Sequence, residues 1–427
     1  MKSLKVGMLG CGTVGSQIAR LLVANKADLT SRAGAQIELV KVAVRDAKVK
    51  RDGIPDNLIT ADANSIVNDP NIDLIIEVIG GISPAKELIL TALKNGKSVV
   101  TANKALLAKS GAELYEAASK ANVDLYYEAA VAGAIPILRP LRESLVGDQV
   151  VRIMGIVNGT TNYILTKMDE SGTAFADALK QAQDLGFAEA DPTADVEGFD
   201  AADKAAILAG LAFHSRVTDK DVYREGISKI TATDVKVAKA MDMVIKLLAI
   251  TELTTAGEIS VRVHPALISR NHPLASVRES YNAVFVEAKS AGQMMFYGRG
   301  AGGEPTASAV LGDLVAVARH KVSGGVGPKE SDYASLKIAP IGQIKTRYLI
   351  RLNVADKPGV LESVAHVFAS HSVSIQTVRQ SGAGDKAELI VMTHHSSESA
   401  LSATVKDLSK LSAVSDVASV LRVEGVI

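Results

Sequence analysis

The fold is decided by residues 4–15, LKVGMLGCGTVG, in which a short apolar run leads straight into three glycines spaced Gly-x-Gly-x-x-Gly. The run has the length and composition of a buried strand, and Ser16–Ala24 follows it with helical spacing. Gly10 permits a tight turn, Gly12 lets the backbone approach a pyrophosphate, and Gly15 lets helix and strand pack closely. The stretch therefore predicts a dinucleotide-binding turn.

The helix after this turn gives a second reason to expect phosphate. Its N-terminus offers N–H groups without an intrahelical partner, at the positive end of the helix dipole, to the phosphates. The motif is informative because it follows a strand and opens a helix. A glycine-rich turn that binds no ligand is the alternative.

Strand and helix signals alternate through the first third of the chain. Apolar runs at Ile37–Val44, Asp73–Ile79 and Ser98–Thr101 are separated by helical segments at Pro84–Lys94 and Gly111–Ala121. Such alternation indicates βαβ units and a parallel sheet, and the largely apolar runs fit strands buried on both faces. We predict a Rossmann domain over residues 1–130, completed by a returning helix at 303–322.

The end of the second predicted strand bears on the choice of cofactor. An acid at this point usually binds the ribose hydroxyl of NAD, whereas an arginine accommodates the 2′-phosphate of NADP. The strand ends Val42-Ala-Val-Arg45-Asp46. Arg45 favours NADP, Asp46 leaves NAD open, and both residues could instead form a solvated turn.

The remaining chain divides into three parts. Residues 131–302 mix strand and helix signals, which predicts an α+β domain, and residues 323–346 are rich in Gly, Pro, Ser and Lys, which is typical of a linker. Residues 347–427 carry signals in the order βαββαβ, which predicts a ferredoxin-like domain. In the α+β part, helices are expected at Thr173–Leu185, Asp200–Phe213 and Thr233–Ile250, and strands at Gln149–Val157, Val261–Pro265 and Ala283–Lys289.

Composition excludes several classes of protein. The 427 residues carry 47 Lys and Arg against 47 Asp and Glu, which argues against a net-basic nucleic-acid protein. The single cysteine, Cys11, excludes an intrachain disulfide and fits a reducing compartment. No apolar run approaches about 18 residues and the N-terminus lacks a signal-peptide pattern, so we expect a cytoplasmic protein without a membrane span.

An acid-rich stretch between Gly186 and Lys204 carries the second chemical signal. It holds six acids and ends with Asp200 and Lys204, one helical turn apart. Acids suit an ammonium group of a substrate, and a lysine can donate a proton to a carbonyl oxygen. From charge alone, a surface ion pair at i,i+4 is an equal alternative.

The stretch Ala182–Lys204 resembles the signature of the homoserine dehydrogenases. The resemblance extends over essentially the whole chain, through TANK at 101–104, NGTTN at 158–162 and GGEPT at 302–306. DKPG at 356–359 resembles the start of an ACT regulatory domain. The family interconverts L-aspartate 4-semialdehyde and L-homoserine with NAD(P)(H) in threonine and methionine biosynthesis. The resemblance thus implies a catalytic and dimerising role for residues 131–302.

The resemblance also implies roles for individual residues. Lys204 would be the general acid or base, Lys104 a second active-site lysine, and Asp200 an orienting group; two nearby ammonium groups would depress each other's pKa. Glu189 would bind the substrate amino group, with Phe187 where the family often has tyrosine. The substrate carboxylate would be bound by Asn158, Gly159, Thr160 and Thr161. The cofactor would be bound by Gly10, Gly12, Thr13, Val14, Gly15, Arg45, Gly80, Thr101, Lys104, Gly186, Gly302 and Glu304.

A loop after the Rossmann strands resembles the family's monovalent-cation loop. One carboxylate with backbone carbonyls suits Na⁺ better than zinc. A plain buried loop is the alternative. The expected residues are Glu128, Val131, Gly133 and Ile135.

The C-terminal domain implies regulation and assembly. ACT domains usually pair and bind an amino acid, so the resemblance implies feedback inhibition by L-threonine in a homodimer or homotetramer, or a purely dimerising domain. Two competing functions are another Rossmann amino-acid or semialdehyde dehydrogenase, and a non-catalytic nucleotide-sensing regulator with an amino-acid-binding ACT domain. Acylating semialdehyde chemistry is discounted because the only cysteine, Cys11, lies in the phosphate turn. Lys204 discriminates: Lys204→Ala should abolish turnover and leave cofactor binding intact, and surviving activity would make the mechanism wrong.

Overall fold

The computed structural model describes residues 2–51, 53–330, 333–382 and 387–425. The chain forms two compact units, each built from three segments. The first unit comprises Met1–Gly159, Asp200–Val222 and Ser280–Leu336, and the second comprises Thr160–Phe199, Tyr223–Glu279 and Lys337–Ile427. These units cut across the domains expected from sequence, whose boundaries remain predictions.

The first unit is built on a six-stranded parallel sheet in the order β3-β2-β1-β4-β5-β6. This order reverses direction at β1 and β4, and ligands of such sheets bind at that switch, beyond the carboxyl ends of the strands. The predicted Rossmann arrangement is therefore confirmed. The strands are β1 (Ser3–Leu9), β2 (Gln36–Ala43), β3 (Ile59–Thr60), β4 (Leu74–Glu77), β5 (Ser98–Thr101) and β6 (Leu125–Tyr126).

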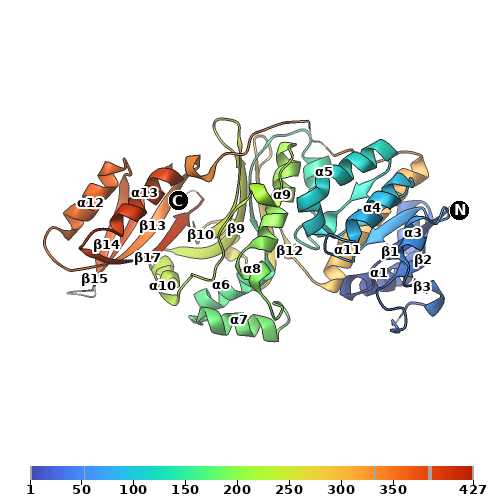
Figure 1. The fold of residues 1–427 in the computed structure, drawn as a ribbon, viewed down its shortest axis with the longest axis horizontal. Coiled ribbons are helices and arrows are strands. Elements are labelled where there is room, and N and C mark those ends of the chain that lie inside the picture. Colours follow the sequence, from blue (N-terminus) through green and yellow to red (C-terminus); the bar gives the residue numbers. More distant parts are fainter. Residues whose placement is uncertain (1, 52, 331–332, 383–386, 426–427) are drawn as a thin grey trace. The chain divides into compact units, whose positions relative to one another are not determined.

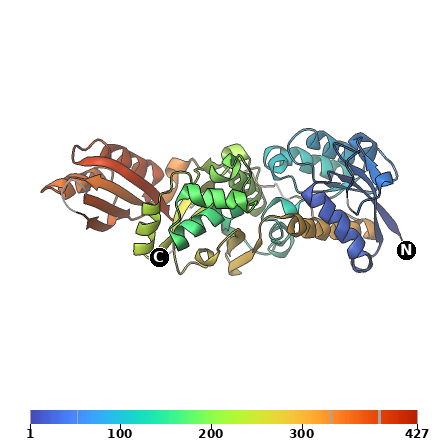
Figure 2. The same ribbon diagram turned by 90° about the horizontal axis from the view of Figure 1, so that it is seen from below.

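Helices cover both faces of this sheet. Leu4, Val6 and Met8 of β1 belong to one core with Ile18 of α1 and Leu314 of α11, which returns beside α1 as predicted (Figures 1 and 2). The opposite face packs on α3, whose side chains crowd the strand at Gly7. The helices are α1 (Thr13–Ala24), α2 (Lys26–Ala33), α3 (Ala63–Val67), α4 (Ala85–Lys94), α5 (Lys104–Ala121) and α11 (Gly303–Ser323).

An antiparallel ladder completes the first unit. β11 (Tyr281–Ala288) pairs with both β7 (Val150–Ile156) and β12 (Gly292–Arg299), of which β12 was missed from sequence. Helix α9 spans Phe199–Phe213 and buries twelve of its residues, including Asp200 and Lys204. Burial of the two charged groups makes the alternative of a surface ion pair wrong.

The second unit contains a continuous sheet in the order β9-β10-β17-β13-β15-β14. Its last four strands form the predicted ferredoxin-like arrangement, with α12 and α13 packed on one core (Figure 1). β10 pairs in parallel with β17, so this sheet runs on into the C-terminal domain. The strands are β8 (Tyr223–Arg224), β9 (Met243–Leu253), β10 (Ile259–Ser269), β13 (Lys345–Val354), β14 (Ile375–Ser381), β15 (Ala387–Thr393), β16 (Ser396–Ser397) and β17 (Val414–Val423). The helices are α6 (Gly159–Ser171), α7 (Phe175–Asp184), α8 (Thr193–Val196), α10 (Ala232–Ala240), α12 (Val360–Ser370) and α13 (Glu398–Leu408).

One predicted helix is wrong. Residues Thr233–Ile250 are divided between α10 and β9, with Asp242 in the left-handed conformation at φ 55° between them. The run from Met243 to Thr251 is buried throughout. An amphipathic helix would leave one face polar, whereas a central strand is buried on both faces, so tertiary packing decides against the helix.

The predicted linker at 323–346 is partly ordered against the sheet. Ile259 N–H donates to Lys337 O at 2.8 Å, and Ala339 N–H donates to Ile259 O at 2.8 Å. Residues 331–332 lie outside the described chain. The end of the linker is thus fixed to the start of β10.

Candidate active site

The glycine turn has the geometry that a pyrophosphate needs. Gly10 has φ 101°, and a Cβ there would lie 2.7 Å from Val78 O; a Cβ on Gly15 would lie 2.5 Å from Gly10 O. A Cβ on Gly12, in contrast, would meet nothing within 4 Å among the described residues. Gly12 is also the N-cap of α1. Gly10 and Gly15 are thus required by packing, whereas Gly12 keeps open the approach to the helix N-terminus, which fits a dinucleotide.

A buried carboxylate that the sequence analysis missed organises the adjacent loop. Glu77 ends β4 and is fully buried. It accepts hydrogen bonds from Ile79 N–H at 2.7 Å, Gly80 N–H at 3.1 Å and the Thr101 hydroxyl at 2.6 Å. Gly80 and Thr101 are thereby brought together at the carboxyl ends of two neighbouring strands. The only sequence signal was one acid closing an apolar run.

Lys104 is positioned by the start of α5. Asn103 is the N-cap: its side-chain oxygen accepts from Leu106 N–H at 3.2 Å, and its amide donates to Gly81 O at 2.7 Å. Lys104 is therefore the first residue of the helix, directly after β5. The predicted start of this helix, Gly111, is wrong by seven residues.

The residues considered for the ribose lie in an exposed turn after β2. Arg45 and Asp46 are both exposed, and Asp46 accepts from Lys48 N–H at 2.9 Å. A second cation, Arg51, lies close enough to the phosphate turn to lower the pKa of Cys11. Burial outweighs that effect and raises the Cys11 pKa, so the thiol stays protonated and packs.

The returning helix α11 begins beside the glycine turn. A Cβ on Gly303 would lie 3.0 Å from Thr13 O, which places the Gly302–Glu304 segment against the first turn of α1. The Glu304 carboxylate pairs with Arg20 at 2.7 Å on the surface. Thr13 thus lies against the start of α11, and the cofactor-binding roles of Thr13, Gly302 and Glu304 remain predictions.

Two lysines share one buried carboxylate in the first unit. The Lys204 ammonium group lies 2.7 Å from Asp200 Oδ2 and donates to Val157 O at 2.6 Å. Lys104 forms an ion pair with the other oxygen, Asp200 Oδ1. Asn158 donates its amide to Asp200 Oδ2 at 2.9 Å. The two ammonium groups are therefore bridged by a carboxylate, which the sequence analysis did not anticipate.

The electrostatics of this cluster keep Asp200 ionised. Burial by itself raises the pKa of Asp200, but Lys204 and Lys104 outweigh it and hold that pKa well below its usual 3.8. The neighbouring Asp203 behaves in the opposite way: burial, followed by the charge of Asp200, raises its pKa to about 6. The Lys204 side chain is 9% exposed and that of Lys104 41% exposed, so Lys104 is the more accessible to a ligand.

Three of the remaining predicted substrate residues, Thr160, Thr161 and Glu189, belong to the second unit, whereas Gly159 belongs to the first. Thr160 donates its hydroxyl to Phe187 O at 2.6 Å, and the Phe187 ring packs 5.2 Å from that of Tyr163. Thr161 is buried, whereas Gly186 and Glu189 are exposed. Within this unit the start of α6 and the acid-rich loop therefore lie together.

The NGTTN turn has a buried support that was not predicted. Lys246 of β9 donates to Asn162 Oδ1 at 2.9 Å and to Val277 O at 2.5 Å. Asn162 in turn donates to Glu279 O at 2.8 Å. Burial lowers the pKa of Lys246 to about 8. Lys246 could not be recognised from sequence as a support of this turn, because the predicted helix Thr233–Ile250 does not place it beside Asn162.

The proposed cation loop is held by its own carboxylate. Glu128 accepts from the backbone N–H groups of Ile137 at 2.6 Å, Leu138 at 2.8 Å and Arg139 at 2.8 Å. The Glu128 carboxylate therefore anchors the loop. Among the described residues, no group of three or more His, Cys, Asp or Glu side chains has the arrangement of a metal site.

A parallel dinucleotide-binding sheet with a lysine–aspartate–lysine cluster after its strands defines an NAD(P)-dependent oxidoreductase. Family models for "Homoserine dehydrogenase" and "Homoserine dehydrogenase, NAD binding domain" match residues 136–315 and 10–128, and a model for "ACT domain" matches residues 348–413. The chain belongs to the homoserine dehydrogenase family. In the described part of the chain, no helix combines the length and apolarity needed to cross a membrane.

Individual relatives agree with this assignment, two of them over nearly the whole chain. A homoserine dehydrogenase of Mycobacterium tuberculosis is 54% identical, covering 99% of this chain and 98% of its own. The solved homoserine dehydrogenase of Thiobacillus denitrificans is 41% identical with a TM-score of 0.95, covering 99% of each chain. A hyperthermophilic archaeal homoserine dehydrogenase in complex with NADPH is 27% identical with a TM-score of 0.63, covering 74% of this chain and 97% of its own.

Proposed function

We propose that the protein reduces L-aspartate 4-semialdehyde to L-homoserine, reversibly, with Lys204 as the group that moves the proton and NADPH as the favoured reductant. The observation that carries the proposal is the buried cluster in which Asp200 joins Lys204 to Lys104. Such a cluster presents a proton donor of fixed orientation, held by a carboxylate that stays ionised at neutral pH.

The chain's own residues supply proton transfer and orientation. When bound, the nicotinamide cofactor supplies the hydride that reaches the aldehyde carbon. Lys204 donates a proton to the aldehyde oxygen and takes it back in the oxidative direction, while Asp200 and Val157 O fix the direction of its ammonium group. Lys104, at the end of β5, adds positive charge that stabilises the developing oxyanion.

The polar ends of the substrate give roles to the other predicted residues. Glu189 binds the amino group, and the N–H and hydroxyl groups of Asn158, Gly159, Thr160 and Thr161 bind the carboxylate. The start of α6 supports the second role, because a helix N-terminus favours an anion. The direct test of the function is the absorbance change at the nicotinamide band when purified protein is mixed with L-homoserine and each oxidised cofactor in turn. Absence of turnover with both cofactors would contradict it.

We expect Arg45→Ala to weaken NADP more than NAD. Arg45 is exposed just after β2, at the position where a Rossmann domain binds the 2′-phosphate of NADP. A hydrogen bond to a charged group contributes about 1.5–3 kcal/mol, which is roughly 10- to 100-fold in affinity. The measurement is the dissociation constant of each cofactor. Lys48→Ala, a nearby exposed cation, is the control and should change neither. Equal losses for NADP and NAD would remove Arg45 from this role.

The C-terminal domain is the proposed site of feedback control. A hollow beside the start of α12 is lined by Lys357, Glu362, His366 and Ser412, which offer both charges that a zwitterionic amino acid needs. We expect L-threonine to lower the initial rate of the full-length enzyme, and Glu362→Gln to weaken that inhibition without changing the uninhibited rate. A rate independent of threonine would contradict feedback control and favour a purely dimerising role for the domain. Sedimentation would then measure whether the protein is a homodimer or a homotetramer.

The cation loop completes the proposal as a structural element. Carbonyl groups at Glu128, Val131, Gly133 and Ile135 are the proposed ligands of Na⁺. Gly133 has φ 56°, and a Cβ there would lie 2.5 Å from Gly300 O, so the loop adopts a conformation that glycine permits. The proposed domain boundaries remain 1–130 with 303–322, 131–302, and 347–427 after the linker at 323–346.

A further inference from the structure

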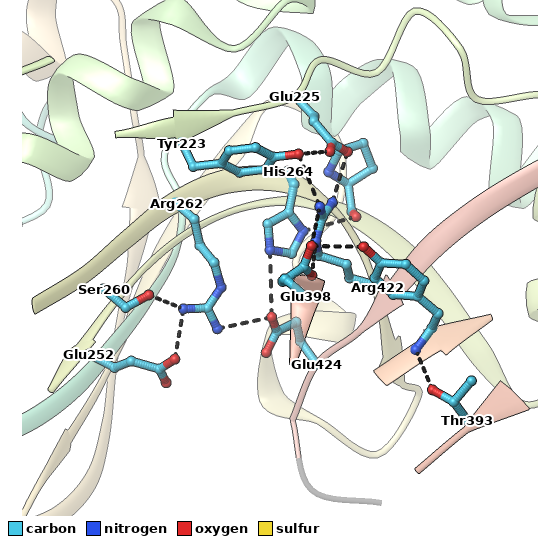
Figure 3. A network of polar contacts seen from close by, with 12 residues as sticks. Tyr223, Glu225, Glu252, Ser260, Arg262, His264, Thr393, Glu398, Arg422 and Glu424 are labelled. Atoms are coloured by element: carbon cyan, nitrogen blue, oxygen red, sulfur yellow. Dashed lines mark hydrogen bonds and ion pairs between the residues drawn. The ribbon is translucent and has the colours of Figure 1, made fainter. Parts of the chain in front are cut away.

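A buried polar network joins the C-terminal domain to the catalytic part of the second unit (Figure 3). Arg422 of β17 makes a two-pronged ion pair with Glu398 of α13, with N···O distances of 2.7 and 3.0 Å. Its remaining guanidinium nitrogen, Nη1, donates to Glu225, next to β8, at 2.9 Å. Nη2, which also binds Glu398, donates to the Tyr223 hydroxyl at 3.1 Å. One arginine thus binds an acid on each side of the junction.

A second arginine repeats the pattern from the other direction. Arg262 of β10 donates to Glu252 of β9 at 2.7 Å and to Glu424, which follows β17, at 3.0 Å. His264 lies 3.5 Å from the same Glu424 carboxylate. The two arginines are buried, whereas the Glu225 side chain is 41% exposed. Apolar residues would hold two surfaces together at lower desolvation cost, so the role that remains for these pairs is to fix one register between the elements they join. The element fixed here by Arg422 is β8.

β8 depends on this fixation because it is very short. It contains two residues, Tyr223 and Arg224, and pairs with β10 only at Arg262 and Val263. The next residue, Glu225, adds one backbone hydrogen bond to Val263 O at 2.8 Å. The hydrogen bonds of Arg422 to Tyr223 and Glu225 therefore add substantially to the few interactions that fix β8 beside β10.

β8 and the residues after it pack against, and form hydrogen bonds with, the segment that leads into α9. A Cβ on Gly226 would lie 2.4 Å from Val196 O, so the two backbones are in close contact. Ile227 N–H donates to Val196 O at 2.8 Å. Arg224 donates to Glu197 O and lies over the Phe199 ring, 3.5 Å from its centroid. A displacement of β8 must therefore displace residues 196–199.

The next residue along the chain is Asp200. Phe199 is the first residue of α9, and Asp200 and Lys204 follow within its first two turns. Covalent continuity within one helix transmits a shift of Phe199 to both. Misplacement of reacting groups by about 1 Å can lower a rate by about 10²-fold.

We propose that Arg422 is a positioning residue for catalysis, which acts through Glu225 and β8 on residues 196–199 and thereby on the Asp200–Lys204 pair. The inference rests on the proposed roles of Asp200 and Lys204. It gives the last strand of the C-terminal domain a part in every turnover, independent of any effector. It also provides the physical connection along which a ligand of that domain would change the rate.

The test compares Arg422→Met with a matched arginine, Arg351→Met. Arg351 lies on the neighbouring strand β13 and is equally buried, with 8% of its side chain exposed. It also bridges two acids, Asp234 of α10 at 3.1 Å and Glu388 of β15 at 2.7 Å, but its ion pairs and hydrogen bonds with the described residues do not include β8. Both substitutions remove a buried junction cation, so both should lower the denaturation midpoint.

Only Arg422→Met is expected to change the chemistry. At a temperature where both variants are fully folded by circular dichroism, Arg422→Met should lower kcat for homoserine oxidation about 10- to 100-fold. The dissociation constant of NADP should stay within about threefold, because the predicted cofactor turn belongs to the first unit and Arg422 to the second, and changes at sites without shared partners are usually independent. Arg351→Met should keep kcat within about twofold. Equal kcat values for the two variants would overturn the proposal.

Two further variants keep the test sharp if Arg422→Met fails to fold. Glu225→Gln removes the ion pair but keeps the shape, and should lower kcat in the same direction; an unchanged kcat would overturn the proposal. Arg422→Lys keeps the charge without the two-pronged geometry and should recover part of the lost kcat. In the double variant Arg422→Lys with Glu225→Gln, the losses should be less than additive because both act through one contact. Lys204→Ala separates the two proposals. If this variant retains activity, the proposed function of the Asp200–Lys204 pair fails together with the proposal on Arg422. If this variant is inactive, a negative result with Arg422→Met contradicts only the positioning role of Arg422.

Discussion

Lys204→Ala is expected to lower kcat by roughly 10³-fold while NADP still binds with an unchanged dissociation constant. General acid–base groups contribute about 10²- to 10⁴-fold, and Lys204 is held by Asp200 at 2.7 Å and Val157 O at 2.6 Å in an orientation suited to proton transfer. The rate is measured with saturating homoserine, and cofactor binding by nicotinamide fluorescence. Turnover within tenfold of the parent enzyme would rule out this mechanism.

Two controls separate proton transfer from charge and from surface effects. Lys204→Arg keeps the positive charge but cannot release a proton near neutral pH, so it should remain as inactive as the alanine variant. Lys120→Ala removes a lysine that also pairs with an acid four residues away, Glu116 at 2.8 Å, but whose side chain is 75% exposed. This exposed pair contributes little, and its loss should leave the rate unchanged.

The dinucleotide-binding turn could be predicted because its determinants are local. The three glycines act mainly through the backbone of residues within one turn, and two consecutive residues, Val78 and Ile79, come from elsewhere. The predicted strand Ser98–Thr101 and the predicted Ala387–Thr393 agree with the structure residue for residue, since each is a short apolar run ended by turn residues. Local composition and period carry this information.

The supports of the site could not be predicted, because they depend on contacts between distant residues. Glu77 and Thr101 are separated by 24 positions, and Lys246 and Asn162 by 84. Arg422 and Glu225 are 197 positions apart and meet only because β17 pairs with β10. A single buried acid or lysine in a strand has no periodic pattern, so its partner is not identifiable without the sheet order.

The same limit explains the error at α10 and β9. Residues 233–250 have apolar positions compatible with a helix, and only the sheet shows that both faces of the second half are covered. The Lys104–Asp200 ion pair illustrates the opposite case. Resemblance to the homoserine dehydrogenases named both residues. That the Asp200 carboxylate pairs with Lys104 and Lys204 at the same time is seen only in the structure.

Asp200→Asn is expected to lower both activity and stability, and the two losses should separate in a double variant. Asparagine keeps the shape of Asp200 but leaves the ammonium group of Lys204 buried without a carboxylate. Removing one partner of a buried ion pair costs roughly 3–5 kcal/mol, and kcat should fall about 10²-fold because Lys204 loses its orientation. Asp184→Asn, which breaks the exposed pair with Lys180, is the control and should change neither quantity.

The double variant Asp200→Leu with Lys204→Met replaces the pair by apolar side chains of similar volume. It should recover most of the free energy of unfolding, since such replacements are often neutral, but none of the activity. The pH dependence gives a further check. Because the folded pKa of Asp200 lies below 3.8, its ion pairs stabilise the parent enzyme above that pH and this contribution is lost as the pH falls below it. The stability gap between the parent enzyme and Asp200→Asn should therefore be largest near neutral pH and narrow in acid. A gap independent of pH would mean that the ionised carboxylate does not hold the two lysines.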